Sequence, residues 1–260
     1  MAGDFDLSGR AAIVTGGNGG IGLGMAKALA RAGCAVSIWG RNQDKNRDAL
    51  AELAKCGRRV EARTCDVTDR AAIEDAFAGT LQSFDRVDGC FANAGVLASF
   101  QQAFVDRTED EWRRMFATNL DGVFHVFQVA LRHMIKRAES GDRFGRLVAT
   151  SSIASLLAMP RGEHYAATKA ALNAMIRALA VEHARYGVTA NSILPGWTES
   201  EMTAGLTANE KFVANVMPRI PVRRFGNPAD FGGIAVYLMS ALSSYHTADC
   251  LVIDGGYSVF

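Results

Sequence analysis

Two side chains four positions apart give the first indication of chemistry. Tyr165 and Lys169 lie at the start of an apolar-periodic segment, and residues i and i+4 share one face of a helix. A phenol has a reference pKa of about 10, so it becomes an efficient base near neutral pH only when a neighbouring cation lowers that pKa. Ser152, thirteen positions upstream, follows an expected strand and offers a hydroxyl to a substrate oxygen. The three residues therefore predict proton transfer, although a surface Tyr–Lys pair and a capping serine would also fit.

A glycine-rich turn near the N-terminus predicts a phosphate-binding site. The expected strand Ala11–Thr15 runs into the sequence TGGNGGIG, Thr15–Gly22, and a helical segment follows. Residues without side chains let backbone amides approach a pyrophosphate, and the helix N-terminus adds a partial positive charge. The spacing is TGxxxGxG, unlike the GxGxxG of larger dehydrogenases. Because glycine also serves ordinary turns, a tight loop without a ligand is the alternative.

The end of the second expected strand indicates which dinucleotide would bind. An NAD enzyme of this type usually places a carboxylate there for the ribose 2′-hydroxyl, but this chain has Gly40 followed by Arg41. Gly40 leaves room, and Arg41 offers charge-assisted donors to a 2′-phosphate. NADP(H) is therefore favoured over NAD(H). The alternative is NAD(H) bound through backbone groups, with Arg41 as a solvated surface residue.

Short apolar runs alternate with amphipathic helical segments along the chain. One helical stripe runs from Ile73 to Phe84 at i, i+3, i+4 spacing, and another from Leu172 to Leu179. Strands separated by helices predict a parallel sheet covered on both faces, and right-handed crossovers make it doubly wound. We expect an α/β fold of the Rossmann type, in one domain spanning residues 1–260. The expected strands are Ala11–Thr15, Cys34–Trp39, Val60–Thr64, Val87–Ala92, Arg146–Ser151, Val188–Leu194 and Cys250–Ile253.

Composition excludes several classes of protein. Of the 260 residues 49% are hydrophobic and 21% charged, with a net charge of +1, so neither a disordered chain nor a dedicated nucleic-acid or anionic-membrane surface is indicated. No stretch has the ~18 apolar residues of a membrane span, and the acidic N-terminus does not resemble a signal peptide. Scattered cysteines without CxxC spacing and histidines without metal-ligand spacing favour a reducing cytoplasm and no bound metal.

Seven short motifs resemble, in order, those of the short-chain dehydrogenase/reductase family over nearly the whole chain. Each motif is weak alone, but each falls at the expected boundary of a strand or helix, and together they are specific. The motifs are TGGNGGIG (Thr15–Gly22), Asp66-Val67, Asn93-Ala94-Gly95, Asn119 in Thr118-Asn119-Leu120, Ser152, Tyr165 with Lys169, and Pro195-Gly196.

The resemblance implies roles for four catalytic positions. Tyr165 is implied as the general acid/base, Lys169 as the residue that binds the nicotinamide ribose and tunes the phenol, and Ser152 as the residue that polarises the substrate carbonyl. Asn119 is implied to bend its helix and to help hold a water that passes protons to Lys169. The implied cofactor-binding residues are Gly16, Asn18, Gly20, Ile21, Gly22, Arg41, Asp66, Val67, Asn93, Ala94, Gly95, Tyr165, Lys169, Pro195, Gly196, Thr198 and Ser200.

Three positions depart from the family pattern. Ala92 replaces a common Asn, Ser200 keeps the hydroxyl of a common Thr, and Ala248 stands where glycine is usual. None of them is a catalytic position, so they bear on local geometry and not on the class of enzyme.

Two residues and one segment bear on the substrate. Arg161 either meets a polar or anionic substrate group or is a solvated loop charge, and His164 either reaches the substrate or is an exposed residue at a helix start. The segment after Pro195-Gly196 is a mobile substrate lid in the family. Its aromatic and Met side chains suit an apolar substrate, although packing of the lid explains them equally well.

These features predict an enzyme that interconverts a carbonyl and a secondary alcohol by hydride transfer, a carbonyl reductase or alcohol dehydrogenase that uses NADP(H). Two alternatives remain: an NAD(H)-dependent alcohol dehydrogenase of the same family, and a non-catalytic nucleotide-binding regulatory protein. The intact catalytic positions favour an enzyme, since a pure binder has no need of the phenol and the ammonium. Keto-acyl, sugar, steroid and simple ketone substrates all fit the sequence.

The family also implies self-association. We expect a cytoplasmic homotetramer, or at least a dimer, that pairs helices near Leu120–Arg137 and Tyr165–Tyr186 and has a second interface around the last helix and strand. The other expected partner is a small carbonyl or alcohol substrate, and neither nucleic acid nor a membrane is expected.

Overall fold

The computed structural model describes residues 3–56, 59–97 and 102–260, and a parallel sheet lies at its centre. Within these residues seven strands pair in the order β3-β2-β1-β4-β5-β6-β7, and every pair is parallel. The predicted α/β sheet is thereby confirmed. The strands are β1 (Ala11–Thr15), β2 (Ala35–Gly40), β3 (Val60–Thr64), β4 (Gly89–Ala92), β5 (Gly145–Thr150), β6 (Val188–Pro195) and β7 (Cys250–Ile253).

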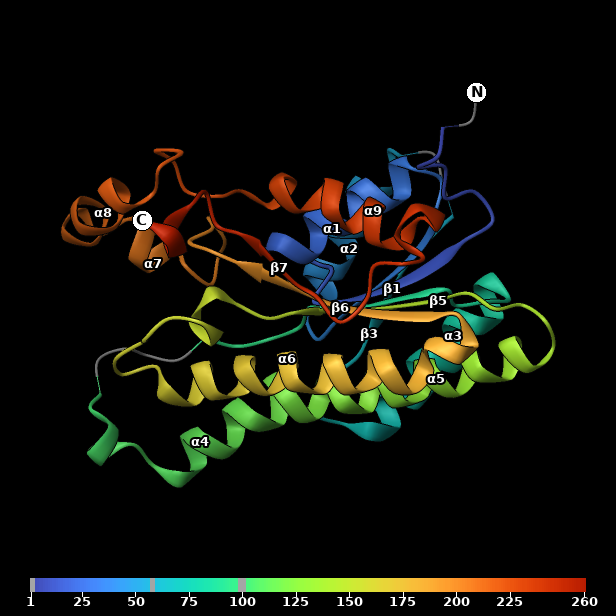
Figure 1. Cartoon of the computed structure of the whole chain (residues 1–260), viewed down its shortest axis with the longest axis horizontal. Coiled ribbons are helices and arrows are strands. Elements are labelled where there is room, and N and C mark those ends of the chain that lie inside the picture. The colour runs from blue at the N-terminus through green and yellow to red at the C-terminus, as the bar shows by residue number, and fades with distance from the viewer. Residues whose placement is uncertain (1–2, 57–58, 98–101) are drawn as a thin grey trace.

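Helices cover both faces of the sheet, as the alternation of strands and helices predicts (Figure 1). One face carries α1 (Gly20–Arg31), α2 (Gln43–Ala54) and α9 (Gly232–Met239), which share a hydrophobic core with the sheet. The other face carries α3 (Arg70–Phe84), α5 (Gly122–Glu139) and α6 (Glu163–His183), with a second core. Three shorter helices lie at one end of the molecule: α4 (Glu109–Phe116), α7 (Ala204–Thr207) and α8 (Glu210–Val216).

The strand order reverses direction between β1 and β4. β2 and β3 extend from one side of β1, whereas β4 to β7 extend from the other side. In open α/β sheets, ligands bind outside the carboxyl ends of the strands at such a reversal. The fold therefore brings the glycine turn after β1 and the segments after β4 and β5 to one edge of the sheet.

A buried carboxylate organises the opposite edge, at the amino ends of the strands. Asp88 directly precedes β4 and is fully buried. Its oxygens accept hydrogen bonds from Arg86 at 2.6 and 2.7 Å, from Arg137 at 2.8 Å and from the amide of Ala11 at 2.9 Å. Arg10 adds an ion pair at 3.4 Å. Because these partners come from separate parts of the chain, Asp88 ties β1, β4 and α5 together.

We expect Asp88→Asn to lower the free energy of unfolding by about 3 kcal/mol or more, because it leaves partly buried guanidinium groups without their countercharge. Urea unfolding measures the change. Asp75→Asn is the matched control, since Asp75 is exposed on α3, and it should change the free energy of unfolding by less than about 0.5 kcal/mol. Equal stability of the two variants would contradict the role given to Asp88.

Three further observations concern metal ligands, membrane spans and cysteines. The described residues contain no group of three or more His, Cys, Asp or Glu placed to hold a metal ion. No helix among them is both long enough and apolar enough to cross a bilayer. The five cysteines are all free thiols.

Candidate active site

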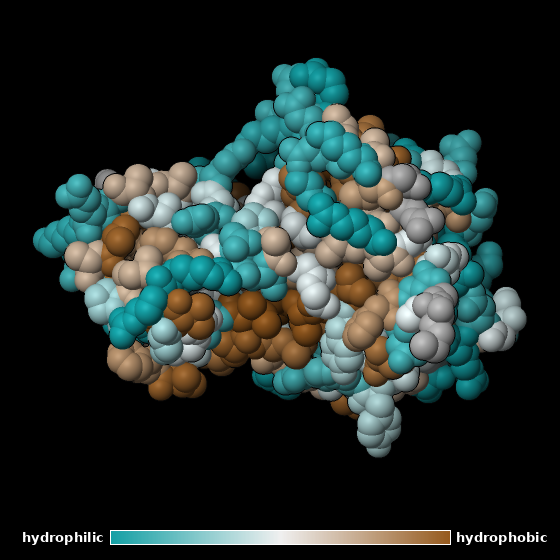
Figure 2. Space-filling model, turned by 90° about the horizontal axis from the view of Figure 1, so that it is seen from above, coloured by the Kyte–Doolittle hydropathy of each residue, from teal (hydrophilic) through white to brown (hydrophobic). Residues whose placement is uncertain are grey.

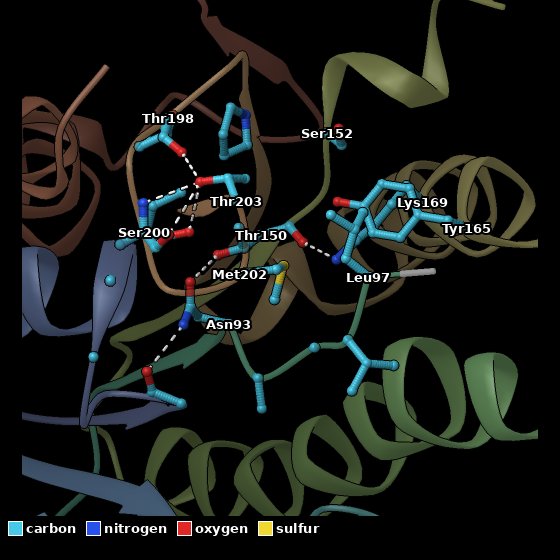
Figure 3. A pocket seen from close by; sticks show the side chains of 18 of the residues that line it. Asn93, Leu97, Thr150, Ser152, Tyr165, Lys169, Thr198, Ser200, Met202 and Thr203 are labelled. Atoms are coloured by element: carbon cyan, nitrogen blue, oxygen red, sulfur yellow. Dashed lines mark hydrogen bonds between the residues drawn. The ribbon is translucent and has the colours of Figure 1, made fainter. Parts of the chain in front are cut away.

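A cavity of about 700 Å³ opens at the carboxyl ends of the strands (Figure 3). Its walls are formed by the glycine turn, the segments after β2 to β5, the start of α6 and the segment after β6. The structure brings all the predicted site residues together in this lining except Gly22 and Asn119, which lie just behind it and are buried.

The glycine turn keeps the cavity wall free of side chains. Gly16 and Gly20 have φ angles of +63° and +49°, a left-handed backbone that favours glycine. A Cβ on Gly22 would lie 2.3 Å from the carbonyl oxygen of Gly16, so only glycine lets α1 start this close to the turn. Gly19 precedes α1 without a side-chain cap, which leaves the amides of the first turn open to an anion. The turn therefore fits the pyrophosphate of a dinucleotide.

Hydrogen bonds among three strand ends hold the glycine turn in place (Figure 3). Oγ1 of Thr15 accepts from the backbone amides of Asn93 and Ala94, both at 3.0 Å. The side-chain amide of Asn93 donates to the carbonyl oxygen of Thr15 at 3.2 Å, and the hydroxyl of Thr150 donates to its oxygen at 3.1 Å. Asn93 thus couples β1, β4 and β5. The sequence marks Thr150 only by its place near the end of an expected strand.

Arg41 and Asp66 lie together at the end of the cavity formed by β2 and β3. Their side chains are 3.6 Å apart and are 64% and 38% exposed. Burial raises the pKa of Asp66, but hydrogen bonds from Thr68 and the charge of Arg41 outweigh it and hold that pKa below its usual value. Asp66 is therefore ionised near neutral pH and able to accept a hydrogen bond from an adenine amino group.

The open space expected beside Gly40 is filled. A Cβ on Gly40 would lie 2.2 Å from Nδ2 of Asn18 and 2.6 Å from Oδ1 of Asn46. These two side-chain amides are hydrogen-bonded at 2.7 Å, and Asn46 also donates to the carbonyl oxygen of Gly40 at 2.9 Å. In this structure two side-chain amides therefore occupy the space beside Gly40, and room for a phosphate there stays a prediction. A side chain at this position would have to displace the amide of Asn18, which folds over Gly40.

An ion pair that sequence analysis missed spans the mouth of the cavity. Lys45, in the first turn of α2, pairs with Glu201, in the segment after β6, and both line the cavity. Asn42 caps α2 by accepting from the backbone amide of Lys45 at 3.0 Å. No local pattern marks a lysine whose partner lies 156 positions away, so the sequence carries no signal for this pair.

Ser152 follows β5 and caps a short 3-10 turn, Ile153–Ser155. Its hydroxyl oxygen accepts from the backbone amide of Ala154 at 3.1 Å. A hydroxyl that accepts in this way still has its own hydrogen to donate. Tyr165 lines the same cavity, and its interaction with Ser152 lowers the pKa of the phenol. The capping role and a contact to a substrate oxygen are therefore compatible.

Tyr165 and Lys169 project from the start of α6 on the same side of the cavity (Figure 3). Nζ of Lys169 lies 5.6 Å from the centre of the Tyr165 ring and donates to the carbonyl oxygen of Thr150 at 2.7 Å. Burial raises the pKa of the Tyr165 phenol, and the hydrogen bond with Ser152 opposes this only in part. The expected net lowering of this phenol's pKa is therefore not found in this structure, because burial decides the direction of the shift.

Lys169 should make the stability of the protein depend on pH. Burial lowers its pKa to about 8, whereas an unfolded lysine has a pKa of about 10.4. Between these values the unfolded chain binds more protons than the folded protein. The free energy of unfolding that depends on Lys169 therefore rises with pH between the folded and the unfolded pKa. This gain is lost as the pH falls through the folded pKa of about 8.

We expect wild type to gain about 1.5 kcal/mol of unfolding free energy relative to Lys169→Met between pH 8 and pH 9.5, with a slope that approaches about 1.4 kcal/mol per pH unit. Urea unfolding without added dinucleotide measures both proteins, and the groups that they share cancel in the difference. Lys136→Met, at an exposed position of α5, should show no such trend. A difference that stays constant with pH would mean that the ammonium is not buried as described.

Asn119 lies behind the cavity in a π-helical turn, Ala117–Asp121, between α4 and α5. The expected bend of its helix coincides with this turn. Its side chain accepts from the amide of Val96 at 2.8 Å and donates to the carbonyl oxygen of Val96 at 2.9 Å. A Cβ on Gly95 would lie 3.2 Å from Oδ1 of Asn119 and 3.7 Å from Nζ of Lys169, so the three residues meet. Asn119 thereby fixes the backbone that follows β4.

Neither Arg161 nor His164 lines the cavity. His164 is 2% exposed, so the interpretation of it as an exposed residue at a helix start is wrong. Burial, and then the charge of Arg107, lower its pKa. The backbone of Arg161 donates to the Glu163 carboxylate at 2.8 Å and accepts from Arg107 at 3.0 Å. Both residues belong to the turn that starts α6.

The segment after β6 forms the wall opposite α6. The hydroxyl of Thr203 donates to the carbonyl oxygen of Thr198 at 2.6 Å and accepts from the amide of Ser200 at 3.0 Å (Figure 3). A Cβ on Gly196 would lie 2.5 Å from Cβ of Asp254, so the segment also packs closely on the C-terminal tail. These contacts give the wall a defined shape.

Comparisons of sequence agree over the length of the chain. A family model described as Enoyl-(Acyl carrier protein) reductase matches residues 16–258. A 3-oxoacyl-[acyl-carrier-protein] reductase of Chlamydia pneumoniae is 34% identical over 97% of this chain and 98% of its own length. A gluconate 5-dehydrogenase of Gluconobacter oxydans (strain 621H) is also 34% identical, over 98% of this chain and 97% of its own.

Solved structures agree with the fold. A short-chain type dehydrogenase/reductase from Mycobacterium marinum has a TM-score of 0.92 at 33% identity, with 98% of each chain covered. A gluconate 5-dehydrogenase from Burkholderia cenocepacia J2315, in complex with NADP and tartrate, has a TM-score of 0.92 at 32% identity, with 100% of this chain and 99% of that chain covered. The chain therefore belongs to the short-chain dehydrogenase/reductase family and is an NAD(P)-dependent oxidoreductase.

Proposed function

We propose that this oxidoreductase uses NADP(H) to interconvert a carbonyl and a secondary alcohol, with Tyr165 as the general acid/base. The observation that carries the proposal is the meeting of Ser152, Tyr165 and Lys169 in the cavity that also contains the glycine turn. A regulatory protein that only binds a nucleotide would have no need of a buried ammonium beside a phenol.

The glycine turn and its neighbours would hold the dinucleotide. Gly16, Gly20 and Ile21 would receive the pyrophosphate at the uncapped start of α1. Asp66 would accept from the adenine amino group, and Lys169 would reach the nicotinamide ribose. When bound, the dinucleotide supplies or accepts the hydride. Further contacts are proposed for Asn18, Arg41, Val67, Asn93, Ala94, Gly95, Tyr165, Pro195, Gly196, Thr198 and Ser200, with Gly22 supporting the turn.

Tyr165 is suited to donate a proton in the reductive direction. Because burial raises its pKa, the phenol is protonated near neutral pH and can donate to the oxygen that becomes the alcohol. The hydroxyl of Ser152 would donate to the same oxygen and hold the carbonyl beside the phenol. In the oxidative direction the phenol must first lose its proton, which the positive charge of Lys169 favours. Asn119 would act as a positioning residue through Val96.

A spectrophotometric screen tests the proposal. NADPH and NADH are offered with ketones, 3-oxoacyl esters, ketoses and oxo acids, and the oxidised dinucleotides with the matching alcohols. The relatives named for 3-oxoacyl-[acyl-carrier-protein] and for gluconate are the reason to include acyl and sugar-acid compounds. Loss of the reduced dinucleotide with at least one carbonyl supports the proposal. Tight dinucleotide binding by calorimetry, with no turnover of any compound, would favour the regulatory alternative.

The chain is further proposed to act as one domain, residues 1–260, in a cytoplasmic homotetramer or at least a homodimer. Apolar side chains stand exposed on the two helices expected to pair, Phe124 on α5 at 46% and Val181 on α6 at 80%. Both helices cover the same face of the sheet (Figure 1). A second copy on this face would remove these side chains from water.

We expect light scattering at micromolar concentration to give a multiple of the 27.8 kDa chain mass for wild type. Val181→Asp should shift the distribution toward smaller species, because it places a charge in the proposed interface. Val105→Asp is the control, since Val105 is 87% exposed and lies outside both helices. A monomeric wild type, or an unchanged mass for Val181→Asp, would count against this interface.

A further inference from the structure

The substrate end of the cavity has mainly apolar walls. They include Leu97, Ile153, Leu157, Trp197, Met202 and Tyr257. Seen from above, the surface is hollowed beside the lobe that carries α7 and α8, and apolar side chains gather in the hollow (Figure 2). Such walls suit the carbon skeleton of a substrate but cannot distinguish one polar end group from another.

One guanidinium interrupts this apolar lining. Among the described residues the charged side chains of the cavity are Arg41, Lys45, Asp66, Lys169, Glu201 and Arg219. Arg41 pairs with Asp66, Lys45 with Glu201, and Lys169 donates to the backbone. The side chain of Arg219 forms no ion pair or hydrogen bond within the parts of the chain that the structure describes.

Arg219 is nevertheless held in a defined place. Its Cζ atom lies 4.5 Å from the centre of the Tyr257 ring. A guanidinium that rests on an aromatic face keeps its five N–H donors, which lie in its own plane, available to an anion. Arg219 is exposed, so a ligand reaches it without displacing a protein partner.

The residue next to Arg219 ties it to the reacting end of the cavity. Ile220 is 2% exposed and packs in one cluster with Tyr257 and Ile153. Ile153 directly follows Ser152, the residue proposed to hold the carbonyl oxygen. Buried contacts therefore place the backbone at Arg219 relative to Ser152, and the ring of Tyr257 places the guanidinium.

The C-terminal tail fixes the other side of this platform. The ring of Tyr257 lies edge-on to Trp197, with centroids 6.4 Å apart, and Trp197 directly follows the Pro195-Gly196 turn. The carboxylate of Asp254 accepts from the amides of Gly256 at 2.8 Å and Ser258 at 2.7 Å. The tail thus holds Tyr257, and with it Arg219, against the wall opposite α6.

From this placement we propose that Arg219 determines specificity by selecting carbonyl substrates that carry a carboxylate remote from the reacting carbonyl. The inference rests on the proposed carbonyl–alcohol activity. The carboxylate would accept from the planar fork of the guanidinium, while the apolar walls cover the methylene groups in between. Since Arg219 does not touch the reacting atoms, it binds ground state and transition state alike, and its loss raises KM with little change in kcat.

Matched substrates test the inference. Straight-chain oxo acids, 4-oxopentanoate, 5-oxohexanoate and 6-oxoheptanoate, are compared with their methyl esters, which differ in the charge of one end. For the best-fitting length we expect wild type to prefer the acid by about tenfold in kcat/KM, and Arg219→Gln to remove that preference through KM. Arg219→Lys should keep part of it. The preference should also shrink at high salt, because the guanidinium is exposed.

The control variant replaces an arginine that, like Arg219, rests on a tyrosine ring but lies outside the cavity. Arg185 is exposed and rests on Tyr186 with its Cζ 4.9 Å from the ring centre, so Arg185→Gln should leave both substrate sets unchanged. If wild type reduces the esters but shows no preference for any acid, or if Arg219→Gln affects acids and esters equally, the inference about Arg219 alone is overturned. If no carbonyl compound is reduced at all, the proposed function fails together with it.

Discussion

Tyr165→Phe should lower kcat by about 10²–10⁴-fold while leaving the affinity for NADPH nearly unchanged, because it removes the proton donor and keeps the ring. The phenol lies beside Ser152 in a cavity that the glycine turn also lines. Among the described residues of that cavity, Tyr165 is the one whose titratable proton is influenced by Ser152. Single-turnover kinetics at saturating NADPH measure the rate, and calorimetry measures the affinity.

The matched control for this variant is Tyr245→Phe. Tyr245 is fully exposed and lies outside the cavity, so its phenol should be dispensable. A Tyr165→Phe enzyme that retains near wild-type kcat would show that the proton comes from elsewhere. A loss of NADPH affinity equal to the loss of rate would show that the phenol acts in binding.

The pH profile adds a test that a purely structural role would not meet. Burial raises the pKa of the Tyr165 phenol, so the protonated form needed for reduction persists through the neutral range. Alcohol oxidation needs the phenolate, and its rate should therefore rise with pH in wild type. The rise should vanish in Tyr165→Phe, whose side chain has no proton to lose.

Local sequence patterns predicted the strands and helices well, because burial determines the pattern of apolar residues within each element. The seven strands are found within two residues of their expected bounds. The central ones are short apolar runs covered on both faces, whereas the edge strand β3 contains Glu61 and Arg63 and is only partly buried. The largest difference is at β4, which begins at Gly89 and not at Val87. Asp88 explains it, because this residue turns its carboxylate into the arginine cluster at the amino ends of the strands.

Contacts between distant segments were not predictable in the same way. The partners of Asp88 include residues 77 and 78 positions away, and no periodicity marks them. Asn18 folds over Gly40, a contact between the glycine turn and the end of β2 that no local pattern marks. At such long-range contacts the residue type can be read in the sequence, but its partner can be read only in the structure.

The departure at Ala248 has a physical consequence. This residue has a φ of +67°, the left-handed backbone that favours glycine, so the glycine expected from the family pattern would fit with less strain. The catalytic positions were easier to predict than this local strain. Tyr165 and Lys169 are separated by one helical turn, so local geometry brings these two together, whereas Ser152 meets them only through the packing of α6 against the turn after β5.

The preference between dinucleotides depends on Arg41, and Arg41→Ala should reduce it. We expect kcat/KM with NADPH to fall about tenfold, the lower end of what a charge-assisted contact provides, because Arg41 is exposed and shares its charge with Asp66. The value with NADH should change by less than about threefold, since the 2′-hydroxyl carries no charge for Arg41 to neutralise. Steady-state kinetics with both dinucleotides and one carbonyl measure the two values.

Arg41→Ala is a cleaner test than a new carboxylate at the end of β2. Gly40→Asp would displace the amide of Asn18 from its place over Gly40, and Asn18 belongs to the glycine turn, so binding of either dinucleotide would suffer. Arg47→Ala serves as the control, because Arg47 lies on the same helix as Lys45 but is 71% exposed, pairs with Asp44 and lies outside the cavity. A wild type that uses NADH as well as NADPH, or an Arg41→Ala variant that loses both equally, would leave Arg41 as an ordinary surface residue and favour the NAD(H) alternative.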